Sequence, residues 1–373
     1  MIINFDNAAT TFPKPTAVKN SVNSAVMRLT SPGRGGHPLG LRTSEAVYSA
    51  RETAARFFGA EPENVVFALN CTHALNMAIH GIMNGGGHLI ISGMEHNSSA
   101  RPAAKLAESG VIKLSVARVY PEAAKTVESF RSLIRSDTKA IVCTIASNVT
   151  GQILPIREIG ELCRLHNIPL IADGAQACGI IDVKLSQGIN ILCTAGHKGL
   201  YGITGTGLLI SDGKFPISPI MQGGTGSGSR SLAQPTLLPE ALESGTVGAV
   251  GIMSVKAGIE FVESVGVNRI FAHEDRICRR FLNELRNERK ITIYREPMAE
   301  YVPIVSFNIN GMTSEKAAAE LAKEGFCLRA GFHCSALAHS QLGTENGTVR
   351  FSPSIFSKEE DAVKLTHIIK KLT

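Results

Sequence analysis

The sequence predicts an α/β fold with a mostly parallel sheet. Two observations support this prediction: continuous apolar runs of strand length recur through the first two thirds of the chain, and amphipathic stretches of helical length separate them. Continuous apolar runs suit strands that are covered on both faces, as in a parallel sheet with crossover helices. We therefore expect a large domain of three layers, with helices on both sides of the sheet.

The elements of this large domain follow one another in a regular order. The expected strands are the apolar runs at residues 65–69, 88–92, 140–145, 168–172, 190–194 and 207–211. The expected helices between them cover residues 44–58, 72–82 and 155–166. In the last of these, apolar side chains at positions 156, 159, 162 and 165 recur at helical spacing and so form one face for burial.

The pattern changes in the last third of the chain. The glycine-rich stretch 223–229, within residues 221–239, predicts a mobile loop. Beyond it the expected elements are a helix at 249–264, a strand at 302–309, a helix at 314–324, a strand at 326–329 and a helix at 358–372. This mixture predicts a smaller α+β C-terminal domain made of residues 1–12 and 255–373, beside a large domain of residues 13–254.

The composition allows two hydrophobic cores, since 44% of the 373 residues are hydrophobic. The 38 basic and 32 acidic residues leave a net charge of +6 without a long block of one sign, so we expect no nucleic-acid partner. No apolar run has the roughly 20 residues of a membrane span, and the first residues do not resemble a secretory leader. The eight cysteines show no paired spacing, so we expect free thiols in a cytoplasmic protein.

Lys198 and Asp173 are the first candidates for chemistry. Lys198 follows one expected strand, inside Gly196-His197-Lys198-Gly199, and Asp173 directly follows the strand before it. Alone, such residues are more often a solvated lysine and a helix cap. Together, an amine and an acid at the ends of neighbouring strands suit pyridoxal phosphate, because the amine forms a Schiff base and the carboxylate keeps the pyridine nitrogen protonated. The pair predicts an enzyme.

Polar groups follow other strands of the same expected sheet. Cys71 and Thr72 open a helix after a strand, where free N–H groups, the helix dipole and the Thr72 hydroxyl favour a phosphate. His96 follows the next strand, and its imidazole could stack on a pyridine ring. Asn148 could donate to a ligand carboxylate or simply make a turn, and both interpretations stay open here.

Cys334 is the second informative site. It follows a short expected strand in Arg329-Ala330-Gly331-Phe332-His333-Cys334, where nearby positive charge favours a thiolate. A zinc site made of His333, Cys334 and His339 lacks a fourth ligand and the usual paired spacing, so we expect a nucleophile and no metal. Arg350 could bind a substrate carboxylate with its planar guanidinium, or form a surface ion pair.

Taken together, these motifs resemble the cysteine desulfurases of the class V aminotransferase family, which are fold-type I pyridoxal phosphate enzymes. The resemblance runs nearly end to end through residues 5–10, 94–96, 147–151, 173–176, 196–198 and 329–334. The span from Cys334 to Arg350 is similar to the branch with the shorter cysteine loop. Several ordered motifs are far more specific than any one of them.

The resemblance implies a role for each cofactor residue. By that similarity Lys198 holds the cofactor, Asp173 pairs with its ring nitrogen, Gln176 donates to its ring oxygen, His96 stacks over the ring, and Thr72, Cys71 and His197 lie at the phosphate. Thr246, in Glu243-Ser244-Gly245-Thr246, resembles a family threonine that reaches the phosphate of the partner subunit. This implies a homodimer with shared sites.

The resemblance also implies the reaction. Asn148 and Arg350 would bind the carboxylate of L-cysteine, Lys198 would move its Cα proton, and Cys334 would take its sulfur as a persulfide, leaving L-alanine. The sulfur would pass to an acceptor protein, for iron–sulfur cluster assembly or another sulfur pathway. The alternatives are a class V enzyme for selenocysteine or cysteine conjugates, with lyase or aminotransferase activity, and a non-catalytic cofactor-binding scaffold.

Overall fold

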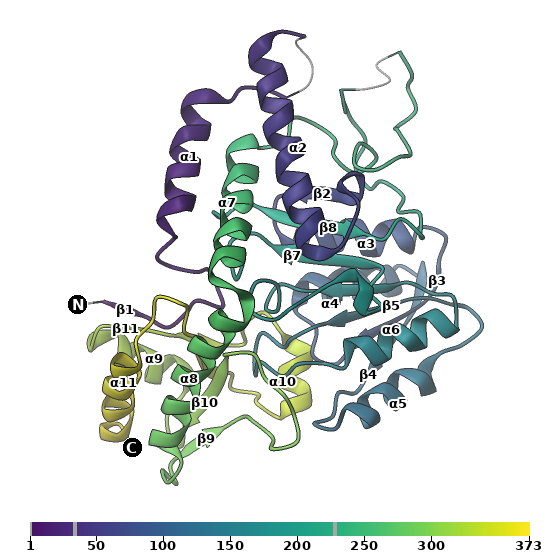
Figure 1. Cartoon of the computed structure of the whole chain (residues 1–373). Coiled ribbons are helices and arrows are strands. Elements are labelled where there is room, and N and C mark those ends of the chain that lie inside the picture. Colours follow the sequence, from purple (N-terminus) through teal and green to yellow (C-terminus); the bar gives the residue numbers. More distant parts are fainter. Residues whose placement is uncertain (1, 33–35, 227–229) are drawn as a thin grey trace.

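The computed structural model describes residues 2–32, 36–226 and 230–373 (Figure 1). Its centre is a sheet that has seven strands in this described part, in the order β2-β8-β7-β6-β5-β3-β4. The strands are β2 (Val65–Ala68), β3 (Gly87–Ser92), β4 (Ile112–Ala117), β5 (Thr138–Thr144), β6 (Leu170–Asp173), β7 (Ile191–Ala195) and β8 (Gly207–Ser211). Strand β8 runs antiparallel to both neighbours, and the pairs from β7 to β4 are parallel. The expected mostly parallel sheet is confirmed.

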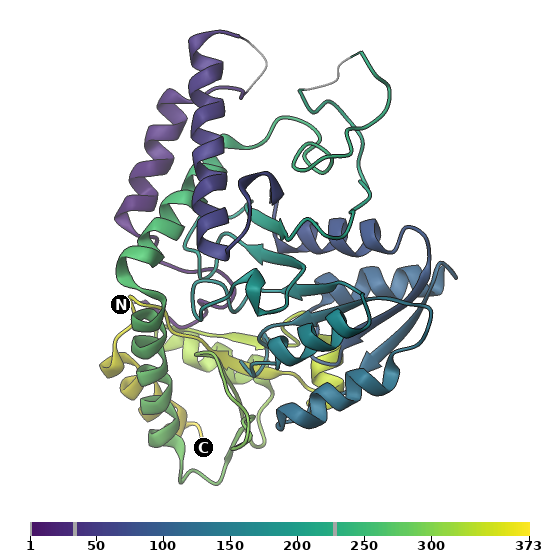
Figure 2. The same cartoon turned by 45° about the vertical axis from the view of Figure 1, so that its right-hand side comes forward.

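Helices cover both faces of this sheet, which gives the three expected layers (Figure 2). One face packs against α2 (Pro38–Phe58), α5 (Ala123–Leu133), α6 (Ile156–Leu165) and α7 (Ala249–Val265). The other face packs against α3 (Cys71–Ile82) and α4 (Asn97–Glu108). Helix α1 (Thr16–Arg28) lies on α7, and the 3₁₀ turns η1 (Pro62–Asn64) and η2 (Leu185–Gln187) complete this region.

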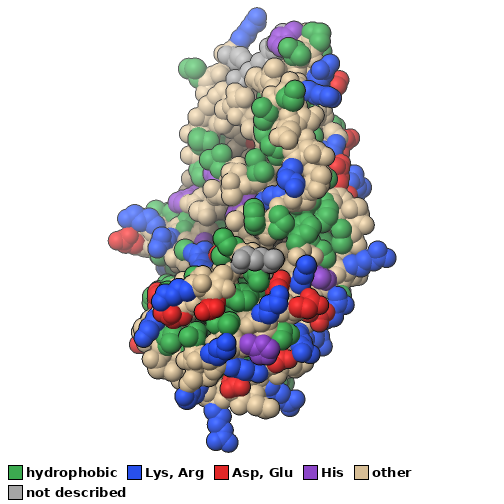
Figure 3. Space-filling view, turned by 90° about the vertical axis from the view of Figure 1, so that its left-hand side faces the viewer, with side chains coloured by type: hydrophobic (Ala, Val, Ile, Leu, Met, Phe, Trp, Pro, Cys, Tyr) green, Lys and Arg blue, Asp and Glu red, His purple; other side chains and the backbone are tan. Residues whose placement is uncertain are grey.

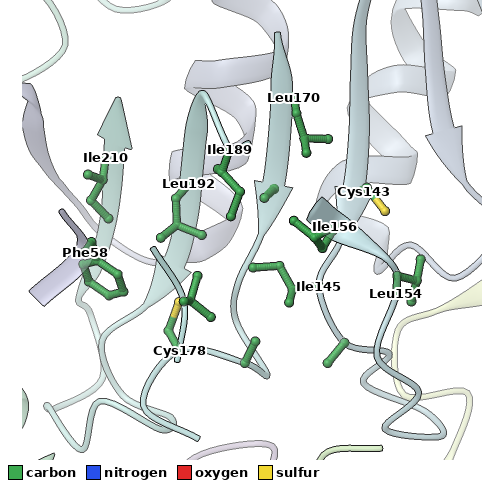
Figure 4. Packing of buried hydrophobic residues seen from close by; sticks show 14 of the residues in the cluster. Phe58, Cys143, Ile145, Leu154, Ile156, Leu170, Cys178, Ile189, Leu192 and Ile210 are labelled. Carbon is green, nitrogen blue, oxygen red and sulfur yellow. The ribbon is translucent and has the colours of Figure 1, made fainter. Parts of the chain in front are cut away.

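The core on the first face shows why the apolar runs form strands. Leu192 and Ile210 come from adjacent strands and meet Phe58 of α2, while Ile156 of α6 packs farther along the same face (Figure 4). Leu192 and Ile210 are fully buried. Strands with helices on both sides have no face left for polar residues, so alternation is lost.

The C-terminal part builds a second, antiparallel sheet in the order β12-β13-β10-β9. Its strands are β9 (Ile291–Ile293), β10 (Val305–Ile309), β12 (Arg329–Gly331) and β13 (Thr348–Phe351). Around it lie α8 (Val267–Leu285), α9 (Ser314–Lys323) and α11 (Glu359–Lys371), whereas α10 (Ala336–Leu342) packs its apolar residues against the cores of the large sheet. The N-terminal strand β1 (Ile3–Asn4) pairs with β11 (Phe326–Cys327), and Phe5 enters this core. The start of the chain therefore packs with its end.

Several elements differ from the expectations. Strand β4 was not predicted, because it is an edge strand whose inner residues are partly exposed, so its apolar run is broken. Helix α2 begins at Pro38, six residues before the expected start at 44. The expected strand over 326–329 is two short strands, β11 and β12. The proposed boundary between the domains, at residue 255, falls inside α7 and stays a prediction.

The surface carries charges of both signs. On the face shown in Figure 3, basic and acidic side chains are interspersed rather than sorted into one field. Within the described residues, no helix is both long and apolar enough to cross a membrane. The parts of the expected loop at 221–226 and 230–239 contain no helix or strand, and residues 227–229 lie outside the described chain.

Candidate active site

The candidate site lies at the carboxyl edge of the large sheet. Strands β3, β5, β6 and β7 are parallel, so Ser92, Thr144, Asp173 and Ala195 end them at one edge. Strand β2 also ends there, because Ala68 pairs with Gly207 and Gly207 with Ala195. Ligands of open α/β sheets gather at this edge.

Lys198 stands in a tight turn just beyond β7. The carbonyl of His197 accepts hydrogen bonds from the Thr11 N–H at 3.2 Å, the Thr10 hydroxyl at 3.1 Å and the Lys14 ammonium at 2.9 Å. The N-terminal segment therefore holds the peptide that precedes Lys198. Burial lowers the pKa of the Lys198 amine, and the carboxylate of Asp173 opposes that shift.

Asp173 is the last residue of β6 and pairs in register with Cys193, on the strand that leads to Lys198. Its Oδ1 accepts a hydrogen bond from the Ala175 N–H at 2.9 Å and another from the Cys71 thiol at 3.4 Å. Asp173 is 3% exposed, so its charge is placed in a low-dielectric environment beside the lysine. The acid therefore ends one strand and the amine follows the adjacent strand, as the sequence predicted.

Helix α3 begins next to these residues. The Asn70 side chain caps it by accepting from the His73 N–H at 2.9 Å, which leaves the Cys71 and Thr72 N–H groups without an intrahelical partner. A side chain at Gly207 would place its Cβ 2.4 Å from the Asn70 carbonyl carbon, so only glycine lets α3 start this close to the sheet. The Thr72 side chain is exposed, and the Cys71 thiol points to Asp173.

His96 caps α4 at the same edge. Its Nδ1 accepts a hydrogen bond from the Ser98 N–H at 3.0 Å, so this nitrogen carries a lone pair. Burial lowers the pKa of His96 to about 4, with Lys198 and two arginines adding to the shift against the opposing effect of Asp173. The imidazole is therefore neutral at pH 7. A neutral ring can stack on a flat ligand without bringing in another charge.

Glu95 directly precedes His96 in the chain and is fully buried. Its Oε1 accepts from the Ser92 hydroxyl and the Thr144 N–H, both at 2.6 Å, and its Oε2 accepts from the Ser99 hydroxyl. Burial raises the pKa of Glu95 to about 7, although its hydrogen bonds oppose the shift. This carboxyl group ties the end of β3 and the start of α4 to β5.

Cys334 lies in the loop between β12 and α10. Its thiol is exposed, and an N–H of Arg329 lies 3.5 Å from Sγ. The backbone of His333 and Cys334 has positive φ, 48° and 58°, which is uncommon for residues other than glycine. The Cys334 carbonyl accepts from the Asn97 N–H at 2.7 Å, directly after His96. The cysteine from the C-terminal part thus meets the edge that holds the lysine.

Two of the remaining expected ligands, Arg350 and Gln176, have hydrogen-bond partners within the chain. Arg350 is 1% exposed; it donates to Asp6 at 3.0 Å and to the Asn148 carbonyl at 2.9 Å. Gln176 donates to the Ala8 carbonyl at 3.0 Å, and a cavity of about 30 Å³ borders Gln176 and Lys198. Thr246 is exposed just before α7. The ligand roles expected for these residues stay predictions.

Sequence reasoning missed the residues that hold these groups in place. Lys14 and Thr11 lie far from Lys198 in sequence, and Ser335 and Gln341 were not singled out. The Gln341 amide bonds the backbone of Val119 twice, at 3.0 and 2.6 Å, and so anchors α10 to the large sheet. No local pattern marks such contacts, because each partner is more than 180 residues away.

Fold and site together define a class of protein: an α/β enzyme with an amine and a carboxylate at the ends of neighbouring strands and a thiol at the same edge. The chain belongs to the aminotransferase class V family, whose description matches residues 3–365. The family resemblance drawn from the motifs is thereby confirmed.

Named relatives extend this finding. The chain is similar to a probable cysteine desulfurase of Methanothermobacter thermautotrophicus, with 28% identity over 378 residues that cover 98% of this chain and 94% of the relative. A cysteine desulfurase of Salmonella choleraesuis is 29% identical over 344 residues, covering 89% of this chain and 84% of the relative.

Solved structures agree with the fold. The apo structure of a cysteine desulfurase from Thermococcus onnurineus NA1 superposes with a TM-score of 0.93 and 27% identity, covering 100% of this chain and 94% of that one. A cysteine desulfurase of Escherichia coli, at 22% identity, has a TM-score of 0.88 over 99% of this chain and 94% of its own. The second likeness shows the fold alone.

Proposed function

We propose that the chain is a pyridoxal phosphate-dependent cysteine desulfurase that converts L-cysteine to L-alanine and keeps the sulfur on Cys334 as a persulfide. The observation that supports this most is that Asp173 ends β6 and Lys198 follows the adjacent strand β7, with the exposed Cys334 at the same edge. The relatives described above are named as cysteine desulfurases. They give no support to the selenocysteine, cysteine-conjugate or scaffold alternatives.

The side chains at the strand ends fit pyridoxal phosphate. Lys198 has a lowered pKa and so reaches the neutral amine form that attacks a carbonyl more readily. The buried Nδ1 of His197 has no hydrogen-bond partner among the described residues, and α3 offers free N–H groups for an anion. Lys198, Asp173, His96, Gln176 and the start of α3 would hold the cofactor. When bound, it supplies the electron sink for the carbanion at the substrate Cα.

The chain's own residues would move the proton and the sulfur. The Lys198 amine, once displaced by the substrate amine, would take the Cα proton and later return one to the product. The Cys334 thiolate would form an S–S bond to the substrate sulfur while the substrate Cβ–S bond breaks, with its electron pair staying on carbon. In total, L-cysteine and one thiol give L-alanine and one persulfide, so no outside oxidant is needed.

The partners follow from the same proposal. A persulfide on an exposed thiol can be passed to an acceptor protein, which would attack the outer sulfur. Thr246 would reach the cofactor phosphate of a second copy of the chain. The protein would therefore be a homodimer with shared sites. All eight cysteines are free thiols, which supports the cytoplasm as the compartment.

One assay tests the proposed function. L-cysteine and a reductant are supplied to the wild type, Cys334→Ala and Lys198→Ala, and both alanine and sulfide are measured. We expect Cys334→Ala to keep the yellow cofactor but to release no sulfide, and Lys198→Ala to lose both the lysine-bound cofactor absorbance and turnover. Undiminished sulfide release by Cys334→Ala would refute the persulfide step. A wild type that stays colourless after reconstitution would refute the cofactor.

A further inference from the structure

The amide of Asn148 is held by the two residues on either side of Cys334. Its Nδ2 donates to the His333 carbonyl at 2.7 Å, and its Oδ1 accepts from the Ser335 hydroxyl at 2.6 Å. Asn148 and Ser335 are both buried, at 7% and 0% exposure. One side chain from the loop after β5 therefore bonds the residues on both sides of the cysteine.

A second contact holds Cys334 itself. The first N–H of α4, from Asn97, donates to the Cys334 carbonyl at 2.7 Å, and the Asn97 side chain accepts from the Ala336 N–H at 3.5 Å. Residues 333–335 are thus bonded one after another to the loop after β5 and to the first residue of α4. Neither contact belongs to the β12-β13-β10-β9 sheet from which the loop extends.

The loop needs such support because its backbone is strained. His333 and Cys334 both adopt positive φ, a region that is sparsely populated for side chains with a Cβ and that costs free energy unless the surroundings impose it. The His333 ring is fixed as well, since its Nε2 lies 3.0 Å from the carbonyl and the hydroxyl of Thr348. Without Asn148, the segment between His333 and Ser335 is free to relax toward commoner conformations.

Asn148 itself is held rigidly. Arg350 donates to its carbonyl at 2.9 Å and is paired with Asp6. The buried guanidinium thus fixes the Asn148 backbone while the Asn148 amide fixes the loop. A substrate carboxylate at this amide would compete with two hydrogen bonds of 2.7 Å or less.

We propose that Asn148 is a positioning residue for the nucleophile: with Ser335 and Asn97 it forms a clamp that sets Cys334 in place at the edge of the large sheet. This rests on the proposed function, in which Cys334 takes the substrate sulfur. Ser335 separates the clamp from a substrate-binding role, because loss of its hydroxyl breaks the Oδ1 bond and leaves the Asn148 amide intact.

The test compares Asn148→Ala, Ser335→Ala and the double variant with the wild type, all with bound cofactor. Three quantities are measured: the half-saturating L-cysteine concentration for the change in cofactor absorbance, the burst of persulfide on Cys334 at saturating L-cysteine, and the alkylation rate of Cys334 by iodoacetamide. Mass spectrometry of peptides separates Cys334 from Cys327, the other exposed thiol. Ser340→Ala, at an exposed position of α10, is the matched control.

We expect each single variant to slow the persulfide burst at least tenfold and to change the alkylation rate at least threefold. For Ser335→Ala, which leaves the Asn148 amide in place, the half-saturating concentration should change less than twofold. The double variant should slow the burst little more than either single variant, because both remove the same clamp. If Asn148→Ala fails to fold, Ser335→Ala still gives the result.

Two outcomes overturn the proposal. The first is a Ser335→Ala variant whose persulfide burst and alkylation rate equal those of the wild type. The second is an Asn148→Ala variant with a tenfold higher half-saturating L-cysteine concentration and a normal burst, which is the behaviour of a residue that only binds the substrate. A wild type that forms no persulfide on Cys334 refutes the proposed function instead. The alkylation rates then still decide whether the clamp orders the loop, since they do not depend on turnover.

Discussion

The two halves of the site are built in different ways. Asp173 ends the buried strand β6 and Lys198 follows the buried strand β7 by three residues, and the main-chain ladder between these two strands aligns their carboxyl ends. Cys334 lies in a loop with positive φ, and side-chain hydrogen bonds from Asn148 and an N–H of Asn97 hold it there. The strand edge is positioned by backbone pairing over many residues, whereas the loop depends on a few polar contacts. A single substitution should therefore disturb the loop more easily than the edge.

The largest effect is expected at the carboxyl edge of the large sheet, where Asp173 lies. Asp173→Ala removes the acid that ends the strand next to β7, and we expect alanine formation to fall by about 10²- to 10⁴-fold, the usual contribution of a placed acid or base. Alkylation of Cys334 should keep the wild-type rate if the two halves are independent. Asp182→Ala, at an exposed position, is the control. If Asp173→Ala slowed the alkylation of Cys334 as much as it slows alanine formation, the two halves of the site would not be independent.

The next effect concerns Glu95, which lies between the two halves. Burial raises its pKa from 4.5 to about 7, so the folded state keeps a proton that the unfolded chain loses. Stability should therefore fall as the pH rises through this window, by up to about 3 kcal/mol. Glu95→Gln imitates the protonated acid and should escape that loss.

This prediction is measured by urea unfolding of the wild type and Glu95→Gln at several values between pH 4.5 and pH 8. The free-energy difference between the two proteins should shift in favour of the variant up to about pH 7 and then level off. Buried histidines with lowered pKa values, such as His96, change stability in the opposite sense, but they act equally in both proteins. Parallel curves would show that Glu95 does not titrate in this window.

A smaller effect is expected at the start of α3. In Gly207→Ala, the new Cβ would lie 2.4 Å from the Asn70 carbonyl carbon, and the overpacking should cost about 1–3 kcal/mol in the free energy of unfolding. Cofactor affinity should fall with it, because the first turn of α3 must move. Gly85→Ala has open space around its Cβ and is the control. Equal stability of the two variants would refute the close approach.

The smallest effect is expected at Cys327, the second exposed thiol. It lies in β11, which pairs with β1 through backbone hydrogen bonds that Cys327→Ser leaves intact. We expect a change below about 0.5 kcal/mol in stability and alanine formation within twofold of the wild type. A large loss of sulfur transfer would show that exposure, rather than the clamp around Cys334, selects the reactive thiol.

The sequence predicted the strand edge because its signals are local. Apolar runs that end at polar residues place Asp173, His96, Asn148 and Lys198 at one edge once the strands are parallel. The edge strand β4 escaped prediction because its inner residues are partly exposed and its apolar run is broken, and α4 escaped because Pro102 and several polar residues interrupt its pattern. Such elements depend on what packs against them.

The sequence by itself therefore determined the fold class, the family and the residue types that can do the chemistry, because strand and helix periods and the motifs after strands are properties of neighbouring residues. Only the tertiary structure decided that Asn148 faces His333 and Ser335, that Lys14 holds the turn before Lys198, and that Arg350 is paired with Asp6. These contacts join residues far apart in the chain, and their geometry exists only after the two sheets have packed together.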